Sequence, residues 1–223
     1  MSRKQFGLGT PDFVDWLEDT FHPEDPALAR IRERAREAGL PDIHLGTFDA
    51  LHLEVLARAS GAQKIVEIGT LAGLSGVALA RALPSNGHLY TFEAHSKHAS
   101  LARETFQEND FESQVTLFEG PALERLPEIE SLTPFDLVFV DADKLNYPNY
   151  AAWAAKYLRI GGLLIGDNTL AFGNIHKSDF TNKREADVIQ GLQKFNDYCA
   201  NSGHFRATIL PTGEGLTLAV KIK

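Results

Sequence analysis

The stretch "VFVDADK", residues 138–144, runs from an apolar segment straight into charge. Its first three residues are the apolar run expected of a buried strand, and Asp141, Asp143 and Lys144 follow directly. Ligands of open α/β sheets bind outside the carboxyl ends of the strands, so acids that follow a strand lie where a ligand can reach them. This cluster is therefore the first candidate for chemistry.

A second apolar run, residues 161–166, is followed by Asp167 and Asn168. If the two runs form neighbouring strands, Asp141 lies close to both residues. Carboxylate and amide oxygens are hard ligands that suit Mg²⁺, Mn²⁺ or Ca²⁺ rather than a thiolate-seeking metal. Three protein ligands leave about three positions of an octahedron open, which is room for two adjacent hydroxyls of a substrate. The pattern predicts a divalent-metal site at Asp141, Asp167 and Asn168.

Lys144 follows Asp141 by one short turn, close enough to reach an oxygen bound to that metal. A phenol has a pKa of about 10 in water, and a bound divalent cation lowers it. An amine beside the phenol can then take the proton as a general base. Lys144 and Asp141 are thus the predicted catalytic residues; the alternative is that Lys144 is a surface ammonium that neutralises Asp143.

The elements that position these residues follow from the hydrophobic periodicity. The first 60 residues have helical spacing, and from residue 64 short apolar runs alternate with helical stretches. That rhythm indicates βαβ units and a mostly parallel sheet with helices on both faces. The expected helices cover 10–21, 25–40, 47–62, 74–83, 96–109, 122–129, 149–160 and 183–200. The expected strands cover 64–69, 88–93, 114–120, 135–141 and 161–167.

The end of the chain has a different pattern. Residues 205–212 and 215–223 hold two apolar runs joined by "PTGEG", which predicts a hairpin. An antiparallel C-terminal pair therefore completes a sheet of seven strands. We expect a single domain over residues 1–223, with an N-terminal helical extension at 1–61 and a catalytic α/β core at 62–223.

Composition narrows the class of protein. The 223 residues carry a net charge of −8 with scattered Lys and Arg, which disfavours a nucleic-acid partner. Cys199 is the single cysteine, which excludes an intrachain disulfide, and we expect it to pack inside a helix. No apolar stretch approaches the roughly 20 residues of a membrane span, and no signal-peptide pattern opens the chain. We therefore expect a cytoplasmic enzyme without a membrane partner.

The loop after the first expected strand, "VEIGTLAGLSG" at residues 66–76, has the glycines of a ligand-binding turn. It lacks the G-x-G-x-x-G of nicotinamide sites and the lysine of a P-loop. Glu67 in this turn would repel a pyrophosphate and suits a cationic ligand, while Glu93 at the end of the second strand fits an acid that accepts both ribose hydroxyls. A nucleoside with positive charge and no phosphate is S-adenosylmethionine; a tight turn in an unrelated α/β protein is the alternative.

Several segments together resemble the cation-dependent O-methyltransferase family, which contains the caffeoyl-CoA and catechol O-methyltransferases and their bacterial members. The segments are "VEIGT", "EGPAL", "DLVFVDADK", "GGLLIGDNTL" and "LPTGEGLTLAVK", and the resemblance spans roughly residues 6–223. It implies the Rossmann-like fold of a class I S-adenosylmethionine-dependent methyltransferase, a homodimer, and a catechol-type small-molecule acceptor with a divalent metal, for which we favour Mg²⁺ over Mn²⁺ or Ca²⁺.

The resemblance also implies roles for individual residues. Lys144 matches the catalytic lysine of the catechol enzymes, and the divalent metal again falls on Asp141, Asp167 and Asn168. Contacts with S-adenosylmethionine are implied at Leu45 (mainly through its backbone), Glu67, Gly69, Thr70, Ser75, Glu93, Ala122, Asp141 and Asp143.

The chain departs from the family where acceptor substrates pack. The glycine loop of the family often carries two tyrosines, and "GTLAGLS" has neither. The family commonly has a tryptophan at the position of Ala171, and the plant enzymes have an asparagine at the position of Phe172. The acceptor is therefore not carried over from the plant enzymes. Loss of the tryptophan predicts a wider acceptor pocket.

Other candidates have simpler interpretations. His95 and His98 are three residues apart on an expected helix, and we expect a solvated helix face rather than a metal pair because no third ligand is near. Trp16 and Trp153 lie on amphipathic helices and are expected to pack in the core or in a dimer interface.

Two other functions stay open from the sequence. One is methylation of a hydroxylated base of transfer RNA, as the resemblance suggests for part of the family, although the acidic balance disfavours it. The other is a non-catalytic S-adenosylmethionine-binding protein. Retention of Lys144 together with the three metal positions argues against the second, since binding alone needs neither metal nor base.

Overall fold

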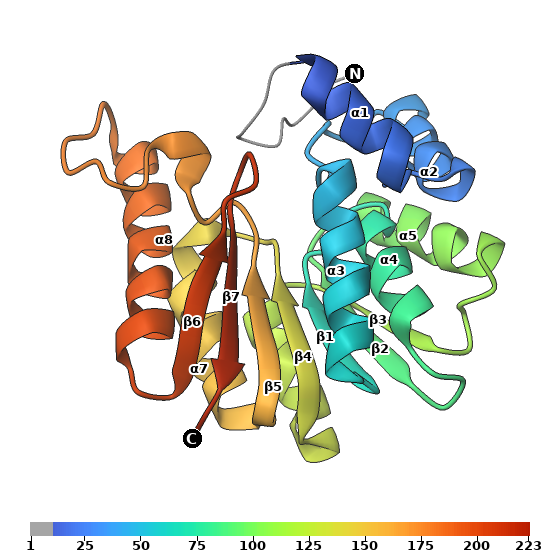
Figure 1. Cartoon of the computed structure of the whole chain (residues 1–223). Helices are drawn as coiled ribbons and strands as arrows, with labels where there is room; N and C mark the ends of the chain where they lie inside the picture. Colours follow the sequence, from blue (N-terminus) through green and yellow to red (C-terminus); the bar gives the residue numbers. More distant parts are fainter. Residues whose placement is uncertain (1–10) are drawn as a thin grey trace.

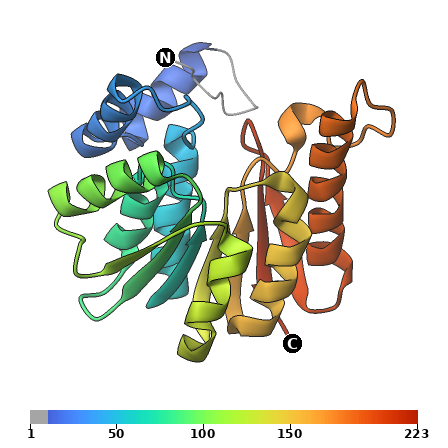
Figure 2. The ribbon, with the colours of Figure 1, turned by 180° about the vertical axis from the view of Figure 1, so that it is seen from behind.

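The computed structural model describes residues 11–223, which form a seven-stranded sheet between two layers of helices (Figures 1 and 2). The strand order is β3-β2-β1-β4-β5-β7-β6. The strands are β1 (Lys64–Ile68), β2 (His88–Glu93), β3 (Val115–Glu119), β4 (Phe135–Val140), β5 (Leu158–Gly166), β6 (Phe205–Leu210) and β7 (Leu216–Lys221). The α/β class, the mostly parallel sheet and the antiparallel C-terminal hairpin are confirmed.

Pairing in the sheet sets which strand ends meet. Strands β1 to β5 pair in parallel, and β7 runs antiparallel to both β5 and β6. Val140 at the end of β4 lies opposite Gly166 at the end of β5, so the residues that follow both strands share one edge. Because β7 is antiparallel, its first residues lie at that same edge, where Thr217 pairs with Gly166. The sheet therefore gathers Asp141, Asp167 and the β6–β7 turn in one place.

Each face of the sheet has its own apolar core because successive residues of a strand point to opposite sides. Ile65, Phe139 and Ile165 pack under α3 (Thr47–Ser60), α4 (Leu74–Ala82) and α5 (Ser96–Glu108). Val66, Val138 and Leu164 pack under α7 (Tyr147–Tyr157) and α8 (Lys183–Asn201) on the opposite side. These strand residues are at most 1% exposed, which explains why β1, β4 and β5 consist of almost uninterrupted apolar residues.

Two N-terminal helices, α1 (Pro11–Phe21) and α2 (Pro26–Glu37), lie beside α3 and α4 (Figure 1). Asp25 caps α2 by accepting hydrogen bonds from the backbone N–H groups of Ala27 and Leu28 at 2.9 and 3.1 Å. Arg81 of α4 also binds this carboxylate at 2.6 Å, so the side-chain cap links the N-terminal helices to the α/β core. The first residue of the helix expected at 10–21 lies outside the described residues.

The two tryptophans have different surroundings. Trp153 stacks obliquely with Phe135 and Tyr157, with ring centroids 5.6 and 4.9 Å apart, and belongs to the core as expected. The indole of Trp16 is 58% exposed, so core packing is wrong for this residue. Only the face of α1 that carries Val14 is covered by the rest of the described chain. For Trp16, packing in a dimer interface therefore stays a prediction.

Two expected helices end earlier than their apolar patterns suggest. The helix expected at 122–129 is a short α6 (Ala122–Arg125) followed by a 3₁₀ segment, η1 (Leu126–Leu132). Pro127 has no N–H for an α-helical bond, which explains the change. The helix expected at 149–160 ends at Tyr157, because Leu158 has extended backbone angles and already pairs with Phe135 of β4.

Two further features bear on the expectations drawn from composition. Cys199 is fully buried in α8, and burial raises the pKa of its thiol to about 12, in agreement with a packing role. Among the helices of residues 11–223, none is long and apolar enough to cross a membrane.

Candidate active site

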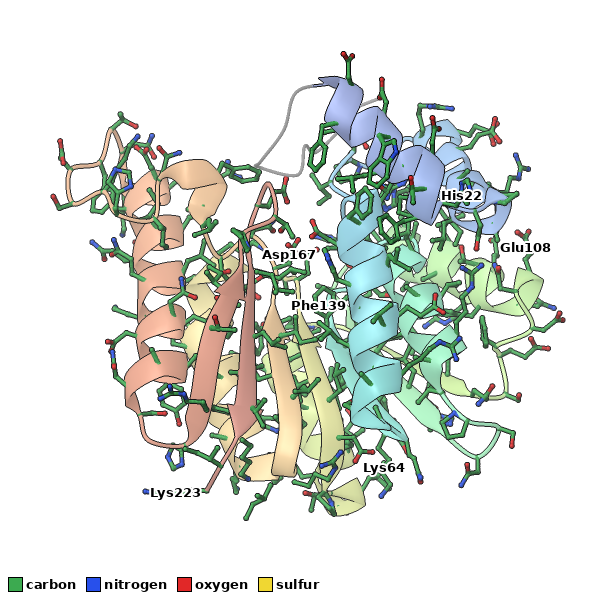
Figure 3. The ribbon with its side chains drawn as sticks, in the orientation of Figure 1. His22, Lys64, Glu108, Phe139, Asp167 and Lys223 are labelled. Carbon is green, nitrogen blue, oxygen red and sulfur yellow. The ribbon has the colours of Figure 1, made fainter. Side chains whose placement is uncertain are left out.

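A cavity of about 1290 Å³ opens at the carboxyl edge of the parallel strands. Single ligand sites are commonly about 300–1,000 Å³, so this cavity has room for two ligands. Figure 3 labels Asp167 near this edge and Lys64 at the opposite one. All predicted site residues except Glu67 and Asp167 line the cavity: Leu45, Gly69, Thr70, Ser75, Glu93, Ala122, Asp141, Asp143, Lys144 and Asn168.

The turn after β1 depends on a glycine. Gly69 has φ +95°, a conformation that residues with a side chain rarely adopt. A Cβ at this position would lie 2.0 Å from the carbonyl oxygen of Asp141. Asp141 also donates its backbone N–H to the carbonyl of Ile68 at 2.9 Å. The missing side chain therefore lets the ends of β1 and β4 approach each other closely.

Glu67 lies just behind this turn and is completely buried. Its Oε2 accepts a 2.6 Å hydrogen bond from Thr91 Oγ1, and its Oε1 has no hydrogen-bond partner among residues 11–223. Burial raises the pKa of Glu67 to about 7, the nearby hydroxyls of Ser75 and Thr91 oppose the shift, and the charge of Asp141 adds to it. A buried acceptor without a donor is costly, so the site is suited to a ligand that brings a donor or a cation.

Glu93 is held rigidly at the end of β2. Its Oε2 accepts from the backbone N–H of Leu71 and its Oε1 from the backbone N–H of His95, both at 2.9 Å. Glu93 is only 7% exposed, yet it lines the cavity. Each carboxylate oxygen has a second lone pair, so Glu93 can still accept two further hydrogen bonds. This arrangement fits the predicted ribose contact.

Of the two histidines after β2, only His98 departs from the expectation of a solvated helix face. His95 is exposed, but His98 has a side chain only 17% exposed, with its Nδ1 3.4 Å from Glu93 Oε1. The two rings lie with centroids 4.9 Å apart, and both line the cavity. Within residues 11–223, no three His, Cys, Asp or Glu side chains form a group that could hold a metal.

Lys144 is oriented by two neighbours. Its Nζ donates to Asp141 Oδ1 at 2.8 Å and to the hydroxyl of Tyr147 at 2.6 Å. Tyr147 lies within hydrogen-bond distance of the carbonyls of Val140 and Asp167, at 3.1 and 3.0 Å. Burial raises the pKa of Tyr147 well above its ordinary value, and the charges of Asp141 and Asp167 raise it further. Tyr147 therefore stays a neutral phenol that fixes the lysine.

Asp143 is not the partner of Lys144, so the alternative that the lysine neutralises Asp143 is wrong. The carboxylate of Asp143 accepts from the hydroxyl of Tyr150 at 2.6 Å and from the side-chain amide of Asn146. Burial and this hydrogen bond raise the pKa of Tyr150, which keeps its hydroxyl a donor. Asp143 thus lines the cavity, and its carboxylate accepts hydrogen bonds from neutral groups rather than from a cation.

Within residues 11–223, Asp167 is a buried carboxylate that lacks the hydrogen bonds and nearby positive charge needed to offset the cost of its burial. It is 1% exposed, and its Oδ1 has no hydrogen-bond partner among the described residues. Burial raises the pKa of Asp167 well above its ordinary value, and the negative charge of Asp141 adds to the effect while Lys144 opposes it. A cation beside Asp167 would remove this penalty. The orphaned oxygen and the oxygen-only donor set fit a hard divalent cation.

Asn168 is the third of the predicted metal-binding residues. Its backbone has a strained conformation. Its φ is +59°, in the left-handed region, which asparagine adopts more readily than most residues. Its side-chain amide nitrogen donates to Glu214 of the β6–β7 turn. The neighbouring backbone is tied to the same turn, because Leu170 N–H donates to the Glu214 carbonyl at 3.0 Å. Positive φ at a non-glycine residue commonly marks a functional constraint.

Two buried acids near this corner were missed by sequence reasoning. Glu214 is 5% exposed, lines the cavity and contacts Asn168. Asp49 of α3 is 4% exposed, and its charge acts on Asp167. A signal existed for Glu214, since the first residues of an antiparallel strand beside β5 must lie at the edge where β5 ends. Asp49 sits inside an ordinary amphipathic pattern, which gives no such signal.

Leu45 and Ala122 belong to the cavity wall through different elements of the fold. The carbonyl oxygen of Leu45 accepts a 2.6 Å hydrogen bond from Arg32, so a ligand contact through that oxygen would have to share it. Ala122 is the first residue of α6, directly after the turn that follows β3. Both residues line the cavity, and their contact with S-adenosylmethionine stays a prediction.

The fold and this cavity define a methyltransferase-like α/β protein, and the sequence comparisons identify the family. The chain belongs to the O-methyltransferase family, whose sequence model matches residues 18–222. A catechol O-methyltransferase of Niastella koreensis is 36% identical over 197 residues, which is 87% of this chain and 87% of that protein. The predicted enzyme class, an S-adenosylmethionine-dependent O-methyltransferase, is confirmed.

Solved structures agree with the family and the fold. An O-methyltransferase from Bacillus cereus in complex with SAH has a TM-score of 0.86 and 32% identity, covering 94% of this chain and 97% of that one. The O-methyltransferase TomG from Streptomyces achromogenes, in complex with SAM, has a TM-score of 0.87 and 31% identity, covering 100% of both chains. The predicted Rossmann-like methyltransferase fold is confirmed.

Proposed function

We propose that this chain transfers the methyl group of S-adenosylmethionine to one hydroxyl of a catechol-type small molecule, with a divalent cation. One juxtaposition carries the proposal: Lys144 Nζ lies 2.8 Å from Asp141 Oδ1, and Asp141 acts electrostatically on the orphaned carboxylate of Asp167. A base and hard oxygen ligands thus share one corner of the cavity. A protein that only bound the cofactor would need neither.

The cofactor residues are proposed as follows. Glu93, held by two backbone N–H groups, accepts the ribose hydroxyls. Glu67, whose Oε1 has no partner among the described residues, pairs with the ammonium of the methionine part. Leu45, Thr70, Ser75, Ala122 and Asp143 form the surrounding walls. The SAH and SAM complexes of the Bacillus cereus enzyme and of TomG support a site of this kind here.

Asp141, Asp167 and Asn168 are the residues that would hold a divalent cation, with Mg²⁺ favoured by the oxygen donors. Such a cation supplies positive charge that lowers the pKa of a substrate hydroxyl. The chain's own contribution is to fix the ligands, because the Asn168 side chain donates to Glu214 of the β6–β7 turn and the Asp167 carbonyl lies within hydrogen-bond distance of the Tyr147 hydroxyl. The catechol O-methyltransferase of Niastella koreensis supports the vicinal-hydroxyl acceptor.

Lys144 has the position of a general base. In its amine form, Nζ takes the hydroxyl proton, and the resulting oxygen anion attacks the methyl carbon. The carbon–sulfur bond breaks, and sulfur leaves with the electron pair as a neutral thioether. Because an anion and a sulfonium cation neutralise each other in this step, the rate depends chiefly on alignment and on deprotonation. The hydrogen bond from Lys144 to Tyr147 supplies the alignment.

Chelation tests the proposal. EDTA should abolish methylation of a simple catechol, and added Mg²⁺ or Mn²⁺ should restore it, while the melting temperature in EDTA reports that the fold survives. Transfer RNA with a hydroxylated base belongs in the same panel of acceptors. Full turnover in chelator would exclude the metal, and methylation of the transfer RNA alone would exclude the catechol acceptor.

We also propose that the chain forms a homodimer. Phe13, Trp16 and Phe21 of α1 are 45%, 58% and 56% exposed. Scattered exposed apolar residues are ordinary, whereas several large ones on one short helix are typical of an interaction surface. A second copy that covers α1 would bury these side chains.

A further inference from the structure

A second, smaller cavity opens off the active site. It has a volume of about 370 Å³ and shares Lys144, Asn168, Phe172 and Arg184 with the wall of the large cavity. Lys144 and Asn168 belong to the corner where the acceptor hydroxyl is proposed to react. The small cavity therefore extends the acceptor end of the site, away from Glu93 and the cofactor end, since neither Glu93 nor Gly69 lines it.

The walls of this side cavity combine a larger apolar part with a smaller polar part. The apolar part comes from Ala171, Val188, Ile189 and Leu192, and the small side chain of Ala171 stands where the family commonly has a tryptophan. The polar part lies around the start of α8 and includes Arg184 and Glu185. An acceptor with a short apolar arm that ends in a polar group matches this division.

Most charged and polar groups of the side cavity are already engaged. Lys144 binds Asp141 and Tyr147. The carboxylate of Glu185 accepts from the backbone N–H of Thr181 at 2.7 Å and from its hydroxyl, and these hydrogen bonds lower the pKa of Glu185. The Asn182 side chain caps α8 by accepting from the Glu185 N–H at 3.0 Å.

Arg184 is different. Its guanidinium makes no hydrogen bond or ion pair with any residue of the described range 11–223, although it lines both cavities. A guanidinium is always charged and presents a fork of donors that fits a carboxylate with two parallel hydrogen bonds. The guanidinium of Arg184 is therefore available to bind an anionic group in the side cavity.

We propose that the acceptor is an acidic catechol, in which a short arm carries a carboxylate from the ring to Arg184. This inference rests on the proposed function. The ring lies at Lys144 and Asn168, the arm passes Phe172 over the apolar wall of Val188 and Ile189, and the carboxylate pairs with Arg184. An arm that ends in an ammonium would meet like charge at Arg184. Glu93, Asp141 and Asp143 of the main cavity do not reverse this preference, because they lie at the proposed cofactor and metal positions and none of them lines the side cavity.

Three acceptors of matched shape test the charge preference: 3-(3,4-dihydroxyphenyl)propionate, its methyl ester and dopamine. With the wild-type enzyme, kcat/KM for the acid should exceed that for the ester by about tenfold, the size expected for a charge-assisted pair partly open to solvent. Arg184→Gln should lower kcat/KM for the acid by about tenfold through KM and leave the ester unchanged. Arg184→Glu should move the preference toward dopamine.

Arg206→Gln is the matched control, because Arg206 is an exposed arginine of β6 that lines neither cavity. It removes the same charge and should leave all three acceptors unaffected. Equal use of acid and ester by the wild type, or an equal loss on both in Arg184→Gln, would overturn the inference. Turnover restricted to a coenzyme A thioester would also overturn it, since the anionic groups would then be phosphates.

A failure of the proposed function can be distinguished from a failure of this inference. If no catechol is methylated, calorimetric titration of the same acid into the protein loaded with S-adenosylhomocysteine and Mg²⁺ still decides the inference. Binding that Arg184→Gln weakens and Arg206→Gln does not would support Arg184 as the group that binds the carboxylate. No binding by the wild type would overturn it.

Discussion

At the scale of single residues, the site depends on four acids that lie at the end of a buried strand or directly after it. Glu67, Glu93, Asp141 and Asp167 could be located because an apolar run leaves few explanations for an acid inside or directly after it. The partners of these acids could not be predicted. That Lys144 pairs with Asp141 rather than Asp143 depends on Tyr147, whose hydroxyl lies 2.6 Å from Nζ. A pairing of that kind is set by tertiary packing.

The first residue-scale prediction concerns Lys144. Lys144→Ala should lower kcat for a catechol by roughly 10²–10⁴, the usual loss on removing a general base. Cofactor affinity should change little, because Glu67 and Glu93 are untouched. Raising the pH should recover part of the rate, since the hydroxyl then ionises without help. Steady-state kinetics between pH 7 and 9 measure both effects.

Tyr147→Phe is the matched variant for this prediction. It removes the hydroxyl that orients Nζ but leaves the amine in place, so the loss of kcat should be smaller than in Lys144→Ala. A Lys144→Ala enzyme with near-normal kcat at neutral pH would contradict the base assignment.

The second residue-scale prediction concerns Glu67. Burial raises its pKa to about 7, so the free protein holds a proton there below neutral pH. Pairing with the cofactor ammonium requires the carboxylate, and binding must expel that proton. The affinity for S-adenosylmethionine should therefore be greatest above pH 7 and fall, by at most about tenfold per pH unit, as the pH drops from 7 toward 5.5. Isothermal titration calorimetry at pH 5.5, 6.5 and 7.5 without metal measures the slope.

Glu67→Gln separates this group from the other acids of the site. The variant should bind more weakly at pH 7.5 and show a flatter pH dependence, because its side chain does not titrate. A wild-type affinity that stays constant between pH 5.5 and 7.5 would show that Glu67 is not the titrating contact.

At the scale of elements, the strands were predicted better than the helix ends. Strands β1, β4 and β5 are buried on both sides, so their apolar runs mark them without ambiguity. The chain from 158 to 160 was expected to be helical, but Leu158 pairs with Phe135 and already belongs to β5. Helical and strand patterns overlap over such short apolar stretches. Only the neighbouring strand decides between them.

The element-scale prediction concerns the contact between α8 and the catalytic turn. A Cβ on Gly191 of α8 would lie 2.2 Å from the backbone carbonyl oxygen of Lys144. Gly191→Ala must therefore separate α8 from the 3₁₀ turn η2 (Lys144–Asn146), which displaces the lysine. We expect a loss of about 1–3 kcal/mol in the free energy of unfolding, typical of overpacking, together with a lower kcat. Urea denaturation and steady-state kinetics measure the two quantities.

Gln190→Ala is the neighbouring control, since Gln190 is exposed on α8 and alanine favours the helix. Its stability and kcat should match the wild type. Unchanged stability and kcat in Gly191→Ala would mean that α8 does not set the position of Lys144.

At the scale of the whole molecule, topology explains why one edge of the sheet carries the chemistry. Five parallel strands bring their carboxyl ends together, and the antiparallel β7 adds its starting turn with Glu214 to the same edge. In Figure 1, α1 and the segment before α8 stand on opposite sides above that edge. The sequence predicted the strands and the hairpin, whereas the inclusion of Glu214 and of Asp49 from α3 required the assembled fold.

The last prediction concerns assembly. Trp16 on α1 is 58% exposed and Phe13 is 45% exposed, while Val14 on the covered face of the same helix is 4% exposed. If a second copy covers α1, light scattering of the wild type should give about twice the chain mass of 24.6 kDa. A glutamate at the centre of such an interface would be buried without a partner, which is strongly unfavourable, so Trp16→Glu should shift the protein toward the monomer. Ile222→Glu changes an apolar residue of 46% exposure at the other end of the chain and should leave the mass unchanged. A wild-type mass of one chain, or a dimer that tolerates Trp16→Glu, would show that α1 is not the interface.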